Sequence, residues 1–398
     1  MKKLLILGGD HFTIPVVKAA KEQGYYVITC DYLPDNVAHK VSDEYVNFST
    51  TDKDGILEWA KKNPIDGIVT FTDSGVVTVA YVQHYLGLPQ IGPVQSVEIL
   101  QNKARFRQFL SEHGFNVPRA RGYKNYDDAI KDVDYFSWPV IVKPVDSAGS
   151  KGVTKLENPE KLKTAVDFAL QYSITGEFII EEFIEKQGCS SDSDSFSVDG
   201  QFKFVSFSAQ RFDDKAVGIY TPAAYSWPSS MSRLFEDELS SELQRLITLL
   251  GMKTSIYNIE TRVGTDGKPY IMELTPRGGG NRLAEMLRFA TGVDMITAAV
   301  RAAVGDAVYG IEQKQYDGFW AEIVVHSDKT GILERIEISP EVESFVKEKD
   351  FWFKKGEAVK EFQSARDAIG TLVLKFPSRD MMERYIANQQ SWLKVMVR

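Results

Sequence analysis

The sequence has few of the residues on which several common chemistries depend. Its two cysteines, Cys30 and Cys189, lie far apart, which argues against a disulfide framework or a zinc site. The five histidines show no ligand spacing, and a net charge of −8 disfavours nucleic acid as a partner. No apolar run approaches the roughly 20 residues that cross a bilayer, and the first one stops at Gly8-Gly9, too early for a signal peptide. We expect a cytoplasmic protein without a membrane partner.

Two familiar nucleotide-binding motifs are also missing. Gly8-Gly9 follows a first apolar strand and Asp31 ends a second, which is similar to a dinucleotide fold. However, residues 11–13 are His-Phe-Thr where further glycines would be needed, so a nicotinamide dehydrogenase is disfavoured. The P-loop pattern GxxxxGK[ST] does not occur either.

The pattern of apolar residues predicts a change of fold class along the chain. Up to Gly92-Pro93, short apolar strands alternate with amphipathic helices, which indicates a parallel, doubly wound α/β sheet. The middle of the chain is predicted to be α+β, with a helix at 95–113, a strand at 138–144 and antiparallel strands within 194–210 and 254–275. After Gly305, another region of strands and helices runs to Arg398.

The segment 255–280 places two glutamates opposite each other. Asp266-Gly267 is typical of a two-residue type I′ turn, which pairs Thr265 with Lys268 and brings Glu260 opposite Glu273. Opposed like charges about 5 Å apart destabilise a hairpin, and a cation such as Mg²⁺ relieves the repulsion. Thr275 and Arg277 continue the same side of the strand. The alternative is a solvated face whose carboxylates oppose each other by chance.

Two lysines and a loop of small residues indicate an anion site. Lys103 falls on the apolar stripe of the predicted helix 95–113, and Lys143 ends the apolar strand WPVIV. The loop that follows lacks bulk, so its backbone N–H groups can approach a phosphate; its residues are Ser147, Ala148, Gly149, Ser150, Lys151 and Gly152. For each feature alone an ordinary role is the alternative: a snorkelling lysine, a charged strand end, or a surface loop.

Together these residues resemble the ATP-grasp superfamily, in the branch with carbamoyl phosphate synthetase large chain, biotin carboxylase and D-alanine–D-alanine ligase. The resemblance covers roughly residues 1–310 and implies three domains. These are a Rossmann-like pre-ATP-grasp domain (1–94), an ATP-grasp domain (95–307) with lobes at 95–183 and 184–307, and a C-terminal α+β substrate or lid domain (308–398).

The resemblance also implies roles for individual residues. Lys103 and Lys143 match the lysines that bind the ATP phosphates, and the loop 146–152 matches a mobile flap over them. Glu181, Glu182 and Ile184 match the hinge that contacts adenine, with Asp192 or Asp194 as the ribose ligand. Glu260 and Glu273 match the metal pair for Mg²⁺ or Mn²⁺, although Thr275 stands where the family has asparagine. Arg277 matches the arginine that holds an acyl phosphate or the carboxylate.

The function that the resemblance implies is an ATP-dependent carboxylate–amine ligase. Mg-ATP would phosphorylate a carboxylate and an amine would attack the acyl phosphate, with catalysis by positioning and charge neutralisation. Asn281 and Arg282 are candidates for substrate contact, and a surface position is the alternative for Arg282. Partners would be small molecules, with a homodimer also expected as in related enzymes. Two alternatives stay open: a carboxylase that uses bicarbonate, and an ATP-binding module that has lost catalysis.

Overall fold

The N-terminal part of the chain forms a parallel sheet, as predicted. The computed structural model describes residues 1–147 and 149–398. The sheet order is β3-β2-β1-β4, and every pair is parallel. Its strands are β1 (Lys3–Leu7), β2 (Tyr26–Cys30), β3 (Glu44–Val46) and β4 (Gly67–Thr70), and its helices are α1 (Ile14–Glu22), α2 (Lys53–Lys62) and α3 (Val76–Leu86). Because helices cover both faces, β1 is buried over its last four residues, which explains its apolar run LLIL.

The helix predicted at 95–113 is in fact two helices, so that prediction was wrong in detail. Helix α4 (Val94–Gln101) ends and α5 (Lys103–Glu112) begins around Asn102, whose extended backbone breaks the helix. The Asn102 side chain accepts hydrogen bonds from the N–H groups of Ala104 and Arg105 and caps α5. Lys103 is therefore the first residue of a helix and does not lie within a continuous apolar stripe.

A four-stranded antiparallel sheet with order β5-β8-β6-β7 forms the next part. Its elements are β5 (Ala120–Tyr123), α6 (Tyr126–Ala129), β6 (Val140–Pro144), β7 (Thr154–Leu156), α7 (Leu162–Leu170) and β8 (Phe178–Glu182). Apolar side chains of β6 and β8 pack on α7, so Lys143 and Glu181, at the alternate positions, are turned to the other face.

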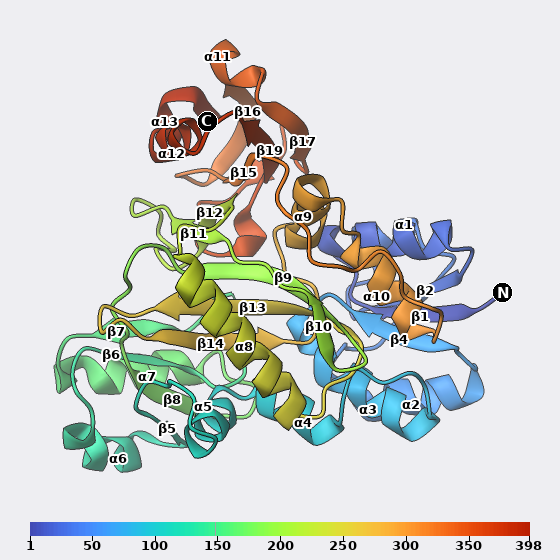
Figure 1. Ribbon diagram of the computed structural model, residues 1–398, viewed down its shortest axis with the longest axis horizontal. Helices are drawn as coiled ribbons and strands as arrows, with labels where there is room; N and C mark the ends of the chain where they lie inside the picture. The colour runs from blue at the N-terminus through green and yellow to red at the C-terminus, as the bar shows by residue number, and fades with distance from the viewer. Residues whose placement is uncertain (148) are drawn as a thin grey trace.

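A second antiparallel sheet lies at the centre of the molecule, with order β10-β9-β13-β14 (Figure 1). Its elements are β9 (Ser191–Val198), β10 (Gln201–Phe204), α8 (Arg233–Leu249), β13 (Ser255–Val263) and β14 (Pro269–Thr275). One face packs on α8, α4 and α5 through residues such as Leu243, Tyr257 and Ile259. The opposite face presents acidic side chains from three strands.

The hairpin of β13 and β14 confirms one part of the predicted register and corrects the other. Glu260 is opposite Glu273 and Asn258 is opposite Thr275, as predicted. Beyond Glu260 the register shifts, so Thr261 is opposite Ile271 and Met272 is an extra, bulged residue. The turn is also longer than predicted: the Gly264 N–H donates to Lys268 O, and Gly267 adopts φ 75° at the end of a three-residue loop. The longer loop and the bulge offset each other.

The C-terminal part contains two sheets and shares one of them with the middle of the chain. Strands β11 (Ala209–Phe212) and β12 (Pro222–Trp227) join β15, β19 and β17 in one sheet with order β11-β12-β15-β19-β17. The other sheet has order β18-β16-β20. The elements are β15 (Phe319–Val325), β16 (Gly331–Ile338), α11 (Pro340–Glu343), β17 (Val346–Phe351), β18 (Ala358–Val359), β19 (Gly370–Phe376), α12 (Arg379–Ala387), α13 (Gln389–Trp392) and β20 (Leu393–Val397). The predicted boundary at residue 307 stays a prediction, but this sheet crosses it.

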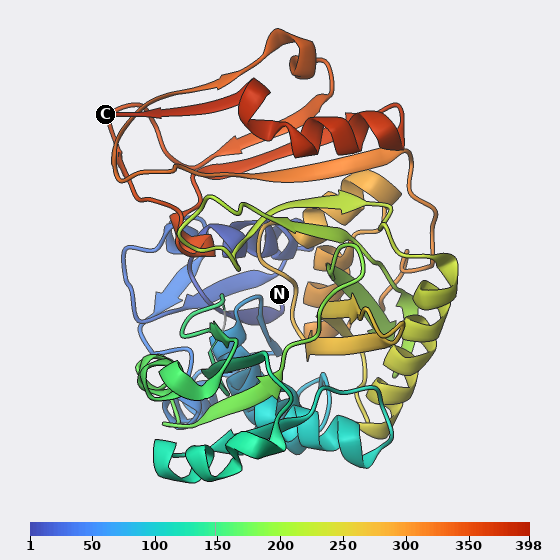
Figure 2. The ribbon, with the colours of Figure 1, turned by 90° about the vertical axis from the view of Figure 1, so that its left-hand side faces the viewer.

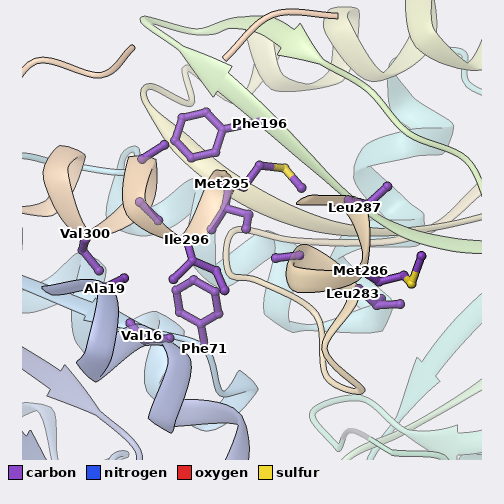
Figure 3. Packing of buried hydrophobic residues seen from close by; sticks show 14 of the residues in the cluster. Val16, Ala19, Phe71, Phe196, Leu283, Met286, Leu287, Met295, Ile296 and Val300 are labelled. Carbon is purple, nitrogen blue, oxygen red and sulfur yellow. The ribbon is translucent and has the colours of Figure 1, made fainter. Parts of the chain in front are cut away.

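Two helices tie the parts together through a shared apolar core. Helix α10 (Met295–Ala303) packs its residues Ile296 and Val300 against α1 of the N-terminal sheet, as Figure 3 shows. Helix α9 (Leu283–Thr291) adds Leu287 to the same core, to which Phe196 of β9 also belongs. Figure 2 shows the C-terminal strands and helices at the top of the molecule. Among the described residues, no helix is long and apolar enough to span a membrane.

Candidate active site

A row of three carboxylates crosses the central sheet. Asp192 on β9 is opposite Glu260 on β13, which in turn is opposite Glu273 on β14. Directly opposed residues point to the same face, so the three side chains share it. Burial and the neighbouring Glu260 raise the pKa of Asp192 to about 7, and burial raises the pKa of Glu260. The crowding of these carboxylates disfavours their charged forms, and Arg262 Nη2, 3.9 Å from Glu260 Oε1, opposes this only in part.

The next row along the same face is also polar, and more of its polar atoms form hydrogen bonds. It consists of Asp194, Asn258 and Thr275. Asn258 Nδ2 donates to Asp192 Oδ1 at 2.7 Å and to Asp194 Oδ1 at 3.2 Å. Both oxygens of Asp194 also accept from the Gly279 N–H, at 2.9 and 3.0 Å. Thr275 is buried, and Gln101 Nε2 lies 3.5 Å from its hydroxyl, at the limit of a hydrogen bond.

Lys103 lies between the acidic row and the loop of small residues. Its ammonium is 3.7 Å from Glu273 Oε1 and donates to the Ser147 carbonyl at 3.0 Å. The backbone also fixes this position, because Lys103 N–H donates to Val145 O at 2.9 Å. A helix start thus brings a cation to the edge of the acidic row.

Lys143 and Arg107 share one buried carboxylate. Lys143 Nζ donates to Glu181 Oε1, and Arg107 Nε donates to Glu181 Oε2 at 2.9 Å. Arg107 also donates to the carbonyl of the bulged Met272 at 2.8 Å, which links the two sheets. Burial alone would raise the pKa of Glu181, but Arg107 and Lys143 outweigh it and hold this pKa at about 2. Two cations and one carboxylate leave a net positive charge close to Glu260.

Arg277 is anchored by the N-terminal part of the chain. Its Nε and Nη2 donate to Asp73 Oδ1 at 2.9 and 2.6 Å, and its Nη1 donates to Gly278 O at 2.8 Å. Asp73 follows β4 and is separated from Arg277 by 204 residues in sequence. Burial raises the pKa of the nearby Asp194 to about 7, although Arg277 opposes this shift.

The loop 146–152 lies near these cations and reaches a distant part of the chain. Ser150 Oγ donates to Tyr220 O at 3.0 Å. Gly149 and Ser150 adopt left-handed backbone, with φ 68° and 57°. Burial lowers the pKa of Lys151, and Arg366 adds to this shift. Ala148, part of the predicted loop, lies outside the described residues.

The predicted hinge residues lie at and just after the end of β8. Glu182 N–H donates to Arg119 O at 2.9 Å, and its carboxylate accepts from Ser137 N at 2.7 Å. The contacts of Glu182 and Ile184 with adenine stay a prediction. Asp192 stands in the acidic row and not beside the hinge, so its role as ribose ligand stays a prediction that this position does not favour.

Three features of the site were missed by the sequence reasoning. Arg107 is buried on α5, and a charged residue among apolar positions was a signal like that of Lys103. Asp73 lies just after a parallel strand, where polar site residues gather. Asp192 opposite Glu260 depends on a strand pairing that no local pattern announces.

Comparison with known proteins connects this geometry to a family. Residues 136–285 match the family model described as "ATP-grasp domain". The carbamoyl phosphate synthase large chain of Ralstonia nicotianae is 23% identical over 325 residues, which cover 77% of this chain and 30% of that protein. The chain thus spans about a third or less of the length of the curated relatives it matches.

Solved structures of similar fold extend over the whole chain. An L-amino acid ligase from Bacillus licheniformis has a TM-score of 0.83 at 18% identity and covers 100% of this chain and 99% of that one. The biotin carboxylase domain of a 2-oxoglutarate carboxylase from Hydrogenobacter thermophilus, solved with MgADP and bicarbonate, has a TM-score of 0.76 at 16% identity. It covers 100% of this chain and 91% of that one. Residues 136–285 thus match an ATP-grasp domain, and solved structures of the same fold cover the whole chain.

Proposed function

We propose that the chain is an ATP-dependent ligase that joins a small-molecule carboxylate to an amine through an acyl phosphate. The observation that carries the proposal is the opposed pair Glu260 and Glu273 with the ammonium of Lys103 3.7 Å away. Two carboxylates can bind the divalent metal ion that accompanies a nucleotide polyphosphate, and an ammonium group beside them can bind its phosphates.

Glu260 and Glu273 would hold Mg²⁺, and Mn²⁺ suits the same oxygen ligands. The fit is supported by their direct opposition and by the raised pKa of Glu260, both of which a cation would relieve. Among the described residues, no group of three acidic, histidine or cysteine side chains is arranged to hold a metal. Two carboxylates suit Mg²⁺, which commonly takes its other ligands from water and phosphates. The ion would supply charge neutralisation between phosphate oxygens.

Lys103 and Lys143 would bind the phosphates of ATP. Lys143 is held by Glu181, and Lys103 by the Ser147 carbonyl, so neither side chain has to be ordered when the nucleotide arrives. The loop residues Ser147, Gly149, Ser150 and Lys151 would cover the phosphates with N–H groups and one more cation. Ile184 would contact adenine at the other end of the site.

Arg277 would hold the carboxylate substrate and the acyl phosphate made from it. Its guanidinium is fixed by Asp73, and it stands one residue away from the glycines 278–280. A positioned guanidinium stabilises the negative charge that develops during phosphoryl transfer and during attack of the amine. Thr275 has the weakest case for a role, because its hydroxyl is buried next to Gln101.

The test is the release of ADP and phosphate from Mg-ATP by the full chain, screened against pooled carboxylates combined with pooled amines. We expect release to need one carboxylate and one amine, and Glu273→Gln to lower it by more than about 100-fold, as typical for the loss of a group that stabilises transition-state charge. Glu238→Gln makes the same chemical change at an exposed site and is the matched control.

Other outcomes would identify the alternatives. Release with bicarbonate as the only carboxylate would indicate a carboxylase. Binding of ATP without stimulated release in any pool would indicate a module without catalysis. A chain that does not bind ATP, or a Glu273→Gln variant with full activity, would refute the proposal.

A further inference from the structure

A row of polar side chains crosses the sheet that β11 and β12 share with the C-terminal strands. Gln210 on β11 is opposite Tyr225 on β12, and Tyr225 is opposite Glu322 on β15. The three side chains therefore lie next to each other on one face. Figure 1 shows β12 and β15 at the level above β9.

This row adjoins the acidic face of the central sheet. Tyr225 Oη donates to Asp192 Oδ2 at 3.3 Å, and Asn281 Nδ2 lies 3.3 Å from the same hydroxyl. Asp192 in turn is opposite Glu260. The row is thus one hydrogen bond away from Asp192, whose neighbour on the next strand is Glu260, one of the two carboxylates assigned to the metal.

Several buried oxygens at this row have no hydrogen-bond partner. Both carboxylate oxygens of Glu322 are unpartnered, and the side chain is 0% exposed. Asn281 Oδ1 and Gln210 Oε1 are also buried without a partner. Among the described residues five such side-chain atoms occur, and four of them belong to these three residues. Each unpartnered group destabilises the fold by its lost hydration, so the fold alone gives no reason to retain them.

The charge around Glu322 is also incomplete. Arg282 is already engaged by three carboxylates: Glu285 at 2.9 Å, Glu348 at 2.8 Å and Asp350 at 3.3 Å. No hydrogen bond or ion pair joins Arg282 to Glu322 among the contacts of the described residues. Burial raises the pKa of Glu322 well above its usual range, Arg282 opposes the shift, and Glu285 adds to it. One guanidinium among four carboxylates leaves room for another cation.

We propose that Glu322, with Asn281 and Gln210, binds the protonated primary amino group of a substrate. An ammonium group supplies the N–H donors and the positive charge that the row lacks, and it is small. The inference rests on the proposed function, since it identifies one substrate of that site.

The ammonium could belong to either substrate of a ligase. It is the amine that attacks the acyl phosphate, or it is an amino group carried by the carboxylate substrate. Both have the same chemistry at Glu322, and the experiments below separate them.

The first experiment needs no ligand. In the ligand-free chain, Glu322→Gln removes an unpartnered carboxyl group and offers amide N–H groups to the neighbouring oxygens. We expect the melting temperature to rise by about 1–4 °C, the size of shift that relief of one unsatisfied group gives in a large domain. Glu341→Gln, an exposed glutamate of α11, should leave it unchanged. An equal or lower melting temperature for Glu322→Gln would mean that the carboxyl group serves the fold, and would overturn the proposal.

The second experiment measures binding in the presence of Mg²⁺ and a non-hydrolysable ATP analogue. The probes are L-amino acids, simple alkylamines such as propylamine, and the matching carboxylic acids without an amino group, such as propionate. We expect compounds with an amino group to raise the melting temperature of the wild-type chain, and Glu322→Gln to weaken their binding at least ten-fold by calorimetry. Protection by alkylamines indicates the attacking amine. An amino acid that protects is assigned by whether its amino group or its carboxylate forms the new bond of the product.

The remaining outcomes count against the proposal. It is overturned if propionate-type acids protect as well as their amino counterparts, if no compound with an amino group protects, or if Glu322→Gln binds them as tightly as the wild-type chain. Protection by the ATP analogue in the same assay separates this failure from that of the proposed function. If the analogue protects, only the amino-group assignment is lost; if it does not, the ATP-dependent function is lost as well.

Discussion

Replacing Glu181 by glutamine should destabilise the fold more than any exposed charge change. The Glu181 carboxylate is 4% exposed and accepts from Lys143 and from Arg107 Nε at 2.9 Å. Glutamine would leave two buried cations beside a neutral amide, and breaking a buried pair in this way costs about 3–5 kcal/mol. The pKa of Glu181 leads to a similar free energy for these ion pairs. Its fall from 4.5 to about 2 corresponds to about 3 kcal/mol of stabilisation at pH 7.

The same depressed pKa sets the direction of the pH dependence. A carboxyl group whose folded pKa lies below its unfolded value stabilises the fold fully above pH 4.5, and this stabilisation is lost as the pH falls towards 2. The difference in unfolding free energy between the wild-type chain and Glu181→Gln should be constant between pH 6 and 8. It should shrink to less than about half near pH 3.

Urea unfolding at pH 7, 5, 4 and 3 measures this difference. The matched control is Glu182→Gln, the next residue, whose side chain is partly exposed and can still accept from Ser137 N as an amide. We expect the control to unfold close to the wild-type chain at every pH. The reasoning is refuted if both variants lose the same stability at pH 7, or if the loss for Glu181→Gln does not depend on pH.

Two further predictions concern the neighbours of Arg277. Asp73→Asn keeps an oxygen acceptor but removes the charge that fixes the Arg277 guanidinium, so it should cost about 2 kcal/mol of stability and lower ligase turnover; unchanged kcat and melting temperature would contradict the anchor. In Gly279→Ala, the new Cβ would lie 2.7 Å from Asp194 Oδ1 and from Asn258 Nδ2, so we expect a loss of about 1–3 kcal/mol. Gly280→Ala is its control, since a Cβ there meets nothing within 4 Å, and equal melting temperatures for the two would count against the close packing.

Local patterns were enough to predict the N-terminal sheet and the acidic pair. The parallel sheet follows from short apolar strands that alternate with helices, because each strand must be buried on both faces. Glu260 and Glu273 lie 13 residues apart on neighbouring strands, close enough in sequence for a single hairpin to bring them together. The turn itself was wrong by one residue, and the pairing survived because the bulge at Met272 restores the register.

Features that depend on distant contacts were not predictable in this way. The break at Asn102 was visible as a capping residue, but the apolar stripe on both sides of it suggested one helix. The addition of β11 and β12 to the C-terminal sheet, and the approach of Asp192 to Glu260, are pairings between strands far apart in sequence. Periodicity tells which face of a strand is buried but not which strand lies beside it.

The two anchored cations of the site differ in what holds them. Lys143 and its anchor Glu181 stand on neighbouring strands of one sheet, so their contact persists wherever that sheet moves. Arg277 follows β14, whereas its anchor Asp73 belongs to the N-terminal part, and the two parts meet through the core of α1 and α10 (Figure 3). Fixing a long charged side chain costs up to about 2 kcal/mol of side-chain entropy, which a preformed anchor removes from the binding step. The packing of α10 on α1 therefore determines how well Arg277 is prepared for a substrate, although neither helix supplies a site residue.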